Sequence, residues 1–127
     1  MTDTQTTRHD WQAMMDVVQS FHDKHRFNQN GGEDMVYRVA LMTEELGEIS
    51  EAVTKGKSKQ ELAEECADLL ILLLGNAIAA DFDLNDAFWL KMETILKRQS
   101  RMVDGRIRVS GAFTNSDSDG NDIGTDG

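Results

Sequence analysis

The sequence predicts an all-α fold, a four-helix bundle followed by a polar tail. Three observations support this prediction. The 127 residues include no proline, the residue that most often breaks or kinks a helix. Apolar residues recur at spacings of three and four along most of the chain, which is the period of an amphipathic helix. Short loop signals rich in glycine, asparagine and lysine separate these periodic segments.

The first helix is expected at residues 10–26, with Thr7 as its candidate N-cap. The segment Asn28–Gly32, with the sequence NQNGG, then indicates a loop. The second helix is expected at residues 33–55, because two acidic residues open it and Gly56 follows its last lysine. Its expected core-facing residues are Met35, Val39, Met42, Leu46, Ile49 and Val53.

The third helix is expected at residues 58–80, because Ser58 followed three residues later by Glu61 forms a capping box. After Asp68 it is apolar over most of its circumference, so we expect it at the centre of the bundle. Cys66 then serves as a small buried apolar side chain. The expected core-facing residues of this helix are Leu62, Cys66, Leu69, Leu73 and Ala77.

The fourth helix is expected at residues 84–103. Asp104-Gly105 follows as a turn between two short extended segments. Together these elements predict one helical domain over residues 1–113. Residues 114–127 are almost entirely polar and are expected to be a disordered acidic tail. Part of this tail resembles the first half of a calcium-binding loop, but no closing glutamate follows.

The charge pattern excludes some functions. The formal net charge is −10, and removing the four aspartates of the tail still leaves −6. An acidic body has little attraction for a nucleic-acid backbone, so we expect no nucleic-acid partner. The N-terminus lacks the apolar core of a signal peptide, and the longest apolar run is too short to cross a bilayer. We therefore expect a cytoplasmic protein without a membrane partner.

Two pairs of carboxylates carry the functional signal. Glu45 and Glu48 are three residues apart on the second helix, as are Glu65 and Asp68 on the third. Residues at this spacing share one helix face. The intervening chain is long enough to finish one helix, turn and run back antiparallel, which brings the two pairs opposite each other. Both pairs are expected immediately beside the apolar seams.

Four facing carboxylates predict a metal site. They repel one another unless cations neutralise them, and hard oxygen ligands select Mg²⁺, Mn²⁺ or Ca²⁺. The alternative, that these are ordinary solvent-facing acids, remains open at this point. A di-iron site requires histidine three residues after a core glutamate. All three histidines lie near the first helix, which argues against it.

Two cations interrupt the apolar stripe of the fourth helix. Lys91 and Arg98 lie there among apolar residues. Their stems can pack while their charged heads reach water, or they can approach phosphate oxygens held by a metal. Carboxylates, metal and inward-facing cations are the components of phosphoryl chemistry.

The carboxylate segments resemble a known family. Glu44–Ala52 (EELGEISEA) and Glu64–Leu70 (EECADLL) are similar to the ordered motif pair of the MazG-like nucleotide pyrophosphohydrolases. These enzymes belong to the all-α NTP pyrophosphatase superfamily. The resemblance covers roughly Val36 to Arg101. It implies a magnesium-dependent enzyme, with Mn²⁺ as a possible substitute. Its reaction would convert a nucleoside or deoxynucleoside triphosphate into the monophosphate and pyrophosphate, often as nucleotide-pool housecleaning.

The resemblance also implies residue roles. Glu48 or Glu45 is the expected general base, and Lys91 and Arg98 are expected to offset charge on the leaving pyrophosphate. The expected magnesium ligands are Glu45, Glu48, Glu65 and Asp68.

Some substrate contacts must differ from those of relatives that carry Asn and Tyr where this chain has Ile95 and Leu72. Asn76 is a candidate substitute, and His22 and Trp11 are candidates for lining the base pocket. For these three residues, packing is the competing interpretation.

Members of the superfamily assemble as dimers or tetramers, and a third helix this apolar independently favours a homo-oligomer that associates through its helices. Two rival functions belong to the same superfamily, namely a phosphoribosyl-ATP pyrophosphatase and a dUTPase. A third rival is a helical interaction module without turnover.

Overall fold

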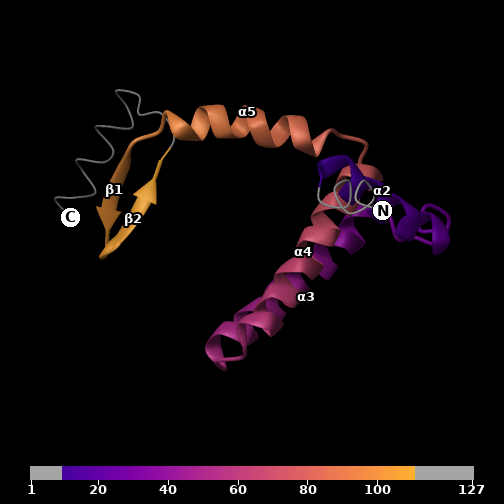
Figure 1. The fold of residues 1–127 in the computed structure, drawn as a ribbon, viewed down its shortest axis with the longest axis horizontal. Helices are drawn as coiled ribbons and strands as arrows, with labels where there is room; N and C mark the ends of the chain where they lie inside the picture. Colours follow the sequence, from indigo (N-terminus) through magenta and orange to yellow (C-terminus); the bar gives the residue numbers. More distant parts are fainter. Residues whose placement is uncertain (1–9, 111–127) are drawn as a thin grey trace, which may run out of the picture. The chain divides into compact units, whose positions relative to one another are not determined.

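The computed structural model describes residues 10–110, shown as a ribbon in Figure 1. The described residues divide into two compact units, one ending at Leu84 and the other beginning at Asn85. No helix within the described range is long and apolar enough to cross a membrane. The expected N-cap Thr7 and the acidic tail lie outside the described residues. The elements are α2 (Trp11–Lys24), α3 (Met35–Thr54), α4 (Lys59–Ala79), α5 (Leu84–Leu96), β1 (Ser100–Val103) and β2 (Arg106–Val109).

The first three predicted helices are confirmed to within two residues at each end. Asp10 caps α2, because its Oδ1 accepts a hydrogen bond from the Ala13 backbone N–H at 2.7 Å. Ser58 and Glu61 form the predicted capping box of α4, in which each side chain accepts from the other residue's backbone N–H. Gly56 lies just beyond α3 with φ +62°, a left-handed conformation that glycine adopts without strain.

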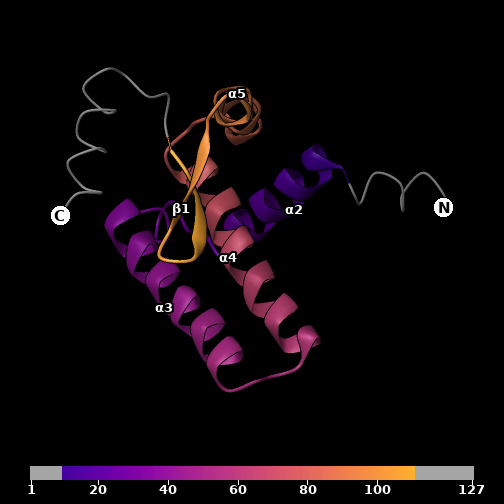
Figure 2. The same ribbon diagram turned by 90° about the vertical axis from the view of Figure 1, so that its left-hand side faces the viewer.

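Helices α3 and α4 form an antiparallel hairpin and lie side by side in both views (Figures 1 and 2). Their buried faces match the predicted seams in part, because Met35, Met42, Ile49, Leu62 and Leu69 are half-buried and Ala77 is buried. On α3 the core-facing stripe includes Arg38, Leu41, Glu45 and Ala52, so it is rotated toward the carboxylates. On α4 the stripe likewise passes through Glu65, Leu72 and Asn76. The carboxylate face is therefore also the packing face of the helix pair.

The rotation leaves part of the predicted seams in solvent. Val39 is 52% exposed and Leu46 is 59% exposed. Cys66 is also exposed, so its predicted burial is wrong for the single chain. The apolar arc of each helix is wider than one neighbouring helix covers. The exposed apolar stripe of the hairpin, as we call it below, comprises Val36, Val39, Leu46, Val53, Leu70 and Leu73.

The tightest packing surrounds the C-terminal half of α4, where α2 lies against it (Figure 2). Four consecutive residues of α4, Leu74–Ala77, are buried on all sides of the helix. Val18 and His22 of α2 are buried too. The prediction that the third helix is central is confirmed for this half only.

The second unit corrects the fourth predicted helix. Helix α5 ends at Leu96, not near residue 103. The chain beyond it enters an antiparallel hairpin in which Met102 lies opposite Ile107. Asp104 and Gly105 form its turn with φ +51° and +76°, and a turn with both central residues at positive φ matches the twist of paired strands. Because this pairing requires extended backbone before Asp104, it competes with the helix and ends it. The extended segments around the Asp-Gly turn are confirmed.

Candidate active site

The structure brings three of the four predicted ligands together. Glu45 of α3 and Glu65 and Asp68 of α4 each offer a carboxylate oxygen, and these oxygens all lie within 4.8 Å of one another. Glu45 and Glu65 are half-buried and Asp68 is exposed. The spacing of three residues between Glu65 and Asp68 on α4 and the antiparallel pairing of α3 with α4 produce this convergence. We refer to these three residues as the acidic cluster.

Burial and mutual repulsion disfavour the negatively charged forms of the carboxylates in the acidic cluster. Burial, followed by repulsion from Asp68, Glu65 and the flanking glutamates, raises the pKa of Glu45 above its usual value. Burial and the charges of Glu48 and Asp68 raise the pKa of Glu65, although Lys57 opposes that shift. A divalent cation would remove this repulsion, which is the electrostatic signature expected of a metal site.

Glu48 lies next to the acidic cluster but not within it. Its side chain is exposed, and its charge contributes to the raised pKa of both Glu45 and Glu65. This placement distinguishes it from the three clustered carboxylates. A carboxylate near a metal that does not itself ligate it is free to accept a proton from water.

Two cavities in the first unit share wall residues, and one of them borders the acidic cluster. The first, about 460 Å³, has Glu45 and Asp68 in its wall together with apolar residues of α2 and α4. The second, about 610 Å³, is lined by aromatic residues and by the loop between α2 and α3. Both cavities share Phe21, Leu41 and Leu72 as wall residues. The first unit thus contains a smaller cavity with acidic residues in its wall, next to a larger cavity lined mainly by aromatic and apolar residues.

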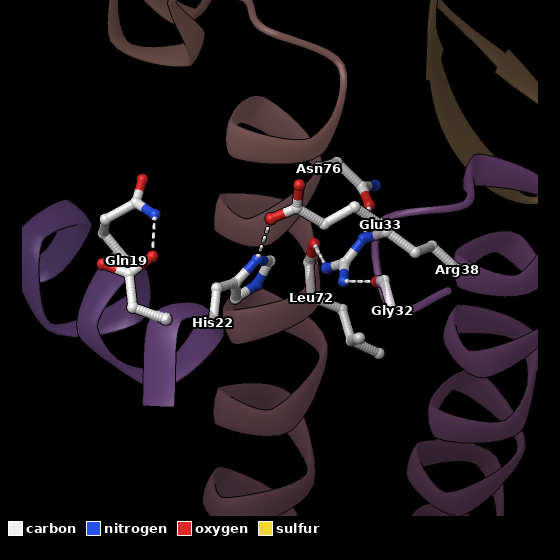
Figure 3. A network of polar contacts seen from close by, with 8 residues as sticks. Gln19, His22, Gly32, Glu33, Arg38, Leu72 and Asn76 are labelled. Atoms are coloured by element: carbon white, nitrogen blue, oxygen red, sulfur yellow. Dashed lines mark hydrogen bonds and ion pairs between the residues drawn. The ribbon is translucent and has the colours of Figure 1, made fainter. Parts of the chain in front are cut away.

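A buried polar network closes the junction of α2, α3 and α4 (Figure 3). Arg38 is 1% exposed, and its guanidinium donates to Asn76 Oδ1 at 2.8 Å, Leu72 O at 2.9 Å and Gly32 O at 3.0 Å. Burial lowers the pKa of Arg38, and the charge of Glu33 partly offsets this. Such a charge is tolerated inside a protein only when its donors are satisfied.

His22 and Asn76, both predicted to contact substrate, belong to this network. His22 is 2% exposed, and its Nδ1 donates to Glu33 Oε2 at 3.0 Å. Asn76 accepts from Arg38 and donates from Nδ2 to Met42 Sδ at 3.1 Å. The contact of His22 joins α2 to the segment before α3, and those of Asn76 join α4 to α3, so both favour the packing interpretation.

Gly75 makes room for the network. A Cβ atom at this position would collide with Arg38 Nη2 and would lie 2.7 Å from His22 Nε2. Only glycine lets both side chains approach α4 this closely. An isolated glycine inside the apolar run of α4 and an arginine among the apolar residues of α3 were the signals in the sequence that could have indicated this network.

Lys91 and Arg98 belong to the second unit. Lys91 is exposed on α5, and Arg98 lies beyond the end of that helix. The predicted stripe that joined them on one helix face is therefore interrupted after Ile95. The Nε of Arg98 is buried without a hydrogen-bond partner among residues 10–110. Their approach to substrate phosphates remains a prediction.

Comparison with known proteins identifies the family. A model of the phosphoribosyl-ATP pyrophosphohydrolase family matches residues 11–89, which is more than half of the chain and includes the acidic cluster, Glu48 and both cavities. The chain belongs to the phosphoribosyl-ATP pyrophosphohydrolase family. No curated protein and no solved structure gave a significant match.

The family is a branch of the MazG-like all-α NTP pyrophosphatase superfamily. The predicted resemblance to this superfamily and the predicted all-α fold are confirmed. Membership of the MazG-like nucleotide pyrophosphohydrolases, the particular group that the two motifs resemble, remains a prediction. A phosphoribosyl-ATP pyrophosphohydrolase is an enzyme that hydrolyses an acid anhydride.

Pyrophosphohydrolases of this family are typically metal-dependent, and the acidic cluster has the oxygen ligands that a divalent cation would need. Mg²⁺ prefers oxygen ligands at about 2.0–2.1 Å, and it usually keeps several waters alongside one or two carboxylates. Three carboxylate oxygens within 4.8 Å of one another match that preference, either directly or through one of the waters. Glu45, Glu65 and Asp68 would hold the ion.

We expect magnesium to stabilise the fold at neutral pH. At a concentration tenfold above the Kd, the free energy of unfolding should rise by about 1.4 kcal/mol. This corresponds to a Tm increase of roughly 4–8 °C for a domain of this size. Differential scanning calorimetry with and without Mg²⁺ measures the shift, and Asp68→Asn should abolish it.

The shift should shrink in acid. Folding raises the pKa values of Glu45 and Glu65. Above these raised pKa values, the charged carboxylates destabilise the metal-free fold. Below the pKa values of the unfolded chain, both residues are protonated in either state and this destabilisation disappears. As the pH falls from neutral toward about 4.5, protons therefore compete with the metal. The exposed residue Glu64 provides the control, because Glu64→Gln should retain the full shift at pH 7.5. A magnesium-induced Tm increase that is as large near pH 4.5 as at pH 7.5 would contradict metal binding by the acidic cluster.

Proposed function

We propose that the chain is a magnesium-dependent pyrophosphohydrolase whose substrate is phosphoribosyl-ATP. The family match over residues 11–89 carries this proposal, and the acidic cluster inside that range supports it. The reaction breaks the anhydride between the α and β phosphates. Water adds to the α phosphorus, and the products are phosphoribosyl-AMP and pyrophosphate.

The side chains divide the chemistry among them. Mg²⁺ held by Glu45, Glu65 and Asp68 would neutralise the triphosphate and make a nearby water more acidic. Glu48, exposed beside the acidic cluster, takes the proton of the attacking water as general base. The half-buried Glu45, the alternative base, is better suited to hold the metal because it is a member of the acidic cluster. Lys91 and Arg98 offset charge on the leaving pyrophosphate.

A simple nucleoside or deoxynucleoside triphosphate is the second candidate substrate. The motif pair Glu44–Ala52 and Glu64–Leu70 favours it, because the pair resembles the MazG-like enzymes that act in nucleotide-pool housecleaning. Both candidates share the same bond, metal and base. They differ in the group attached to the nucleobase.

Product analysis tests the proposal. Purified protein with Mg²⁺ is incubated separately with phosphoribosyl-ATP, each common NTP and each dNTP, and pyrophosphate and monophosphate are followed. Pyrophosphate release that is fastest from phosphoribosyl-ATP supports the first candidate, and fastest release from an unmodified triphosphate supports the second. Release of orthophosphate would contradict the reaction itself. A folded but inactive protein would favour the helical interaction module.

We also propose that the protein is a homo-oligomer, a dimer or tetramer, formed through the exposed apolar stripe of the hairpin. The stripe includes exposed apolar residues of both helices, and exposed apolar surface that gathers into one patch usually marks an interface. Analytical ultracentrifugation should show the wild type as an oligomer and the double variant Val39→Glu/Leu46→Glu as a smaller species. Leu96→Glu is the control, because Leu96 is 78% exposed but lies outside the stripe. A monomeric wild type would contradict the proposal.

A further inference from the structure

The β-hairpin formed by β1 and β2 gathers three arginines on one face. Arg101 lies directly opposite Arg108, and Arg106 lies opposite Val103, which is on the same face of β1 as Arg101. The three arginines are exposed, and none of them forms an ion pair within residues 10–110. Like charges directly opposite each other destabilise a sheet, and a two-stranded hairpin is marginally stable on its own. The arginine face, as we call Arg101, Arg106 and Arg108, is therefore suited to an anionic partner.

Three exposed glutamates surround the acidic cluster in the first unit. They are Glu44 and Glu48 of α3 and Glu64 of α4, and none of them forms an ion pair within the described range. Their charges contribute to the raised pKa of Glu45 or Glu65, so they lie near the cluster. Glu44 and Glu48 are one helical turn apart, and like charges at this spacing destabilise a helix. We refer to Glu44, Glu48 and Glu64 as the glutamate flank.

The arginine face and the glutamate flank have complementary charge. Residues 85–110 contain six lysines and arginines and three acidic residues, whereas residues 10–84 contain six and fifteen. Guanidinium groups bind carboxylates through paired hydrogen bonds, which makes such contacts stronger than other ion pairs. A nucleic-acid backbone is a less suitable partner, because the acidic body of the chain would repel it. A second copy of the chain supplies the required carboxylates.

We propose that the arginine face of one copy docks on the glutamate flank of a second copy. This contact is distinct from association through the exposed apolar stripe of the hairpin. Glu44 and Leu46 are two residues apart on α3, and Glu64 and Leu73 are nine residues apart on α4. At about 100° per residue, each spacing places the two side chains on opposite sides of their helix. The glutamate flank and the stripe can therefore each contact a different part of another copy.

Docking would bring guanidinium groups close to the acidic cluster of the second copy. There they could donate to the phosphate oxygens of a nucleotide, so that one subunit would contribute cations to the site of another. The buried Arg38 of the first unit cannot supply this charge, because its guanidinium already donates to three acceptors. This consequence rests on the proposed function, whereas the docking itself does not.

Two charge-reversal variants test the docking. One carries Arg101→Glu and Arg108→Glu, and the other carries Glu44→Arg and Glu64→Arg, while Glu48 is left intact because of its proposed role as base. In each variant alone, docking would bring like charges together. When the two variants are mixed, both reciprocal contacts between unlike copies join opposite charges. Copies of the two variants should therefore associate with each other in preference to copies of their own kind.

Fluorescence energy transfer between donor-labelled and acceptor-labelled copies measures this preference. In about 50 mM NaCl, the equilibrium constant for forming mixed pairs should exceed its statistical value by roughly tenfold, the size expected for several exposed ion pairs acting together. In about 500 mM NaCl it should fall toward the statistical value, because salt screens exposed charges. Lys24→Glu mixed with Glu93→Arg is the matched control. Both residues are exposed and lie outside the two surfaces, so these variants should mix statistically at either salt concentration.

Two further variants identify the occupant and the docking face. A chain that combines all four reversals should associate with itself as the wild type does and should avoid the wild type. If that chain regained association but the mixture did not, the partner would not be a second copy, and the proposal would be overturned. Ile107→Thr changes the opposite face of the β-hairpin, where Ile107 is 68% exposed, and should leave association unchanged. A loss as large as that in Arg101→Glu/Arg108→Glu would assign docking to the apolar face instead.

These outcomes are separable from those of the proposed function, because association is measured without substrate. Statistical mixing of the two charge-reversal variants in low salt would overturn the docking, even if the protein hydrolyses phosphoribosyl-ATP. Preferential mixing without any hydrolysis would retain the docking and reject the enzyme.

Discussion

Glu48→Gln should lower kcat by about 10²–10⁴-fold, the usual contribution of a general base, while KM and the magnesium-induced Tm shift stay close to wild type. Its exposed carboxylate lies outside the three-oxygen cluster, so its loss removes the proton acceptor and leaves the metal ligands in place. Steady-state kinetics with pyrophosphate detection and calorimetry on the same preparation measure both properties.

Asp68→Asn provides the contrast. This substitution removes a ligand oxygen of the acidic cluster, so activity and the magnesium-induced shift should be lost together. Glu64→Gln, which changes an exposed neighbour of the cluster, should affect neither. If Glu48→Gln abolished the magnesium shift as Asp68→Asn does, Glu48 would be a ligand, and the role of base would pass to another carboxylate.

Gly75→Ala should destabilise the protein by about 3–5 kcal/mol, although alanine is the better helix former by about 1 kcal/mol. The added methyl group would collide with Arg38 Nη2. Arginine ends are normally flexible, but this guanidinium is buried and held by three acceptors. Moving it leaves a buried charge with broken hydrogen bonds, which is among the more destabilising changes a core can undergo.

Thermal unfolding followed by circular dichroism measures this effect, and the Tm should fall by more than about 10 °C. The matched substitution is Gly47→Ala in α3, where an added Cβ would meet no atom within 4 Å. It should raise the Tm by a few degrees, because only the helix-propensity gain remains. Opposite signs for the same chemical change would demonstrate that contacts with Arg38 and His22 decide the effect. A Gly75→Ala variant as stable as wild type would refute that role.

The helices of the first unit were predictable because their signals are local. Capping by Ser58 and Glu61, the glycine-rich loop after α2 and Gly56 after α3 all act within a few residues. The fourth helix was predicted too long because two local signals compete there. The periodic pattern continues to Met102, but the Asp104-Gly105 turn requires extended partners on both sides.

The orientation of the helices could not be read from the sequence with the same accuracy. Each of α3 and α4 has an apolar arc that is wider than one neighbour covers, so periodicity allows several rotations. The structure selects the rotation that buries Arg38 against Asn76, a contact between residues 38 positions apart. No short sequence pattern predicts a contact between residues this far apart in the chain. The convergence of Glu45, Glu65 and Asp68 was nevertheless foreseeable, because it depends only on spacing and antiparallel pairing.

The aromatic cavity was missed for a related reason. Phe21, Phe27 and Tyr37 are scattered through a helix end, a loop and a helix start. They converge only because the chain folds back at the loop between α2 and α3. Gly32 permits this, because a Cβ there would lie 2.5 Å from the Phe27 ring. Aromatic residues on both sides of a glycine-rich loop are the signal that could have indicated the cavity.

The rotation of both helix faces toward their carboxylates has an evolutionary consequence. Glu45 and Glu65 occupy half-buried positions on the packing surface of the hairpin, where apolar side chains would pack without repulsion. Activity and thermal stability therefore make opposite demands on the same positions. Selection for heat resistance alone would replace these two glutamates with apolar residues. Selection for catalytic activity keeps them, and the protein is then less stable than the same fold with apolar residues at both positions.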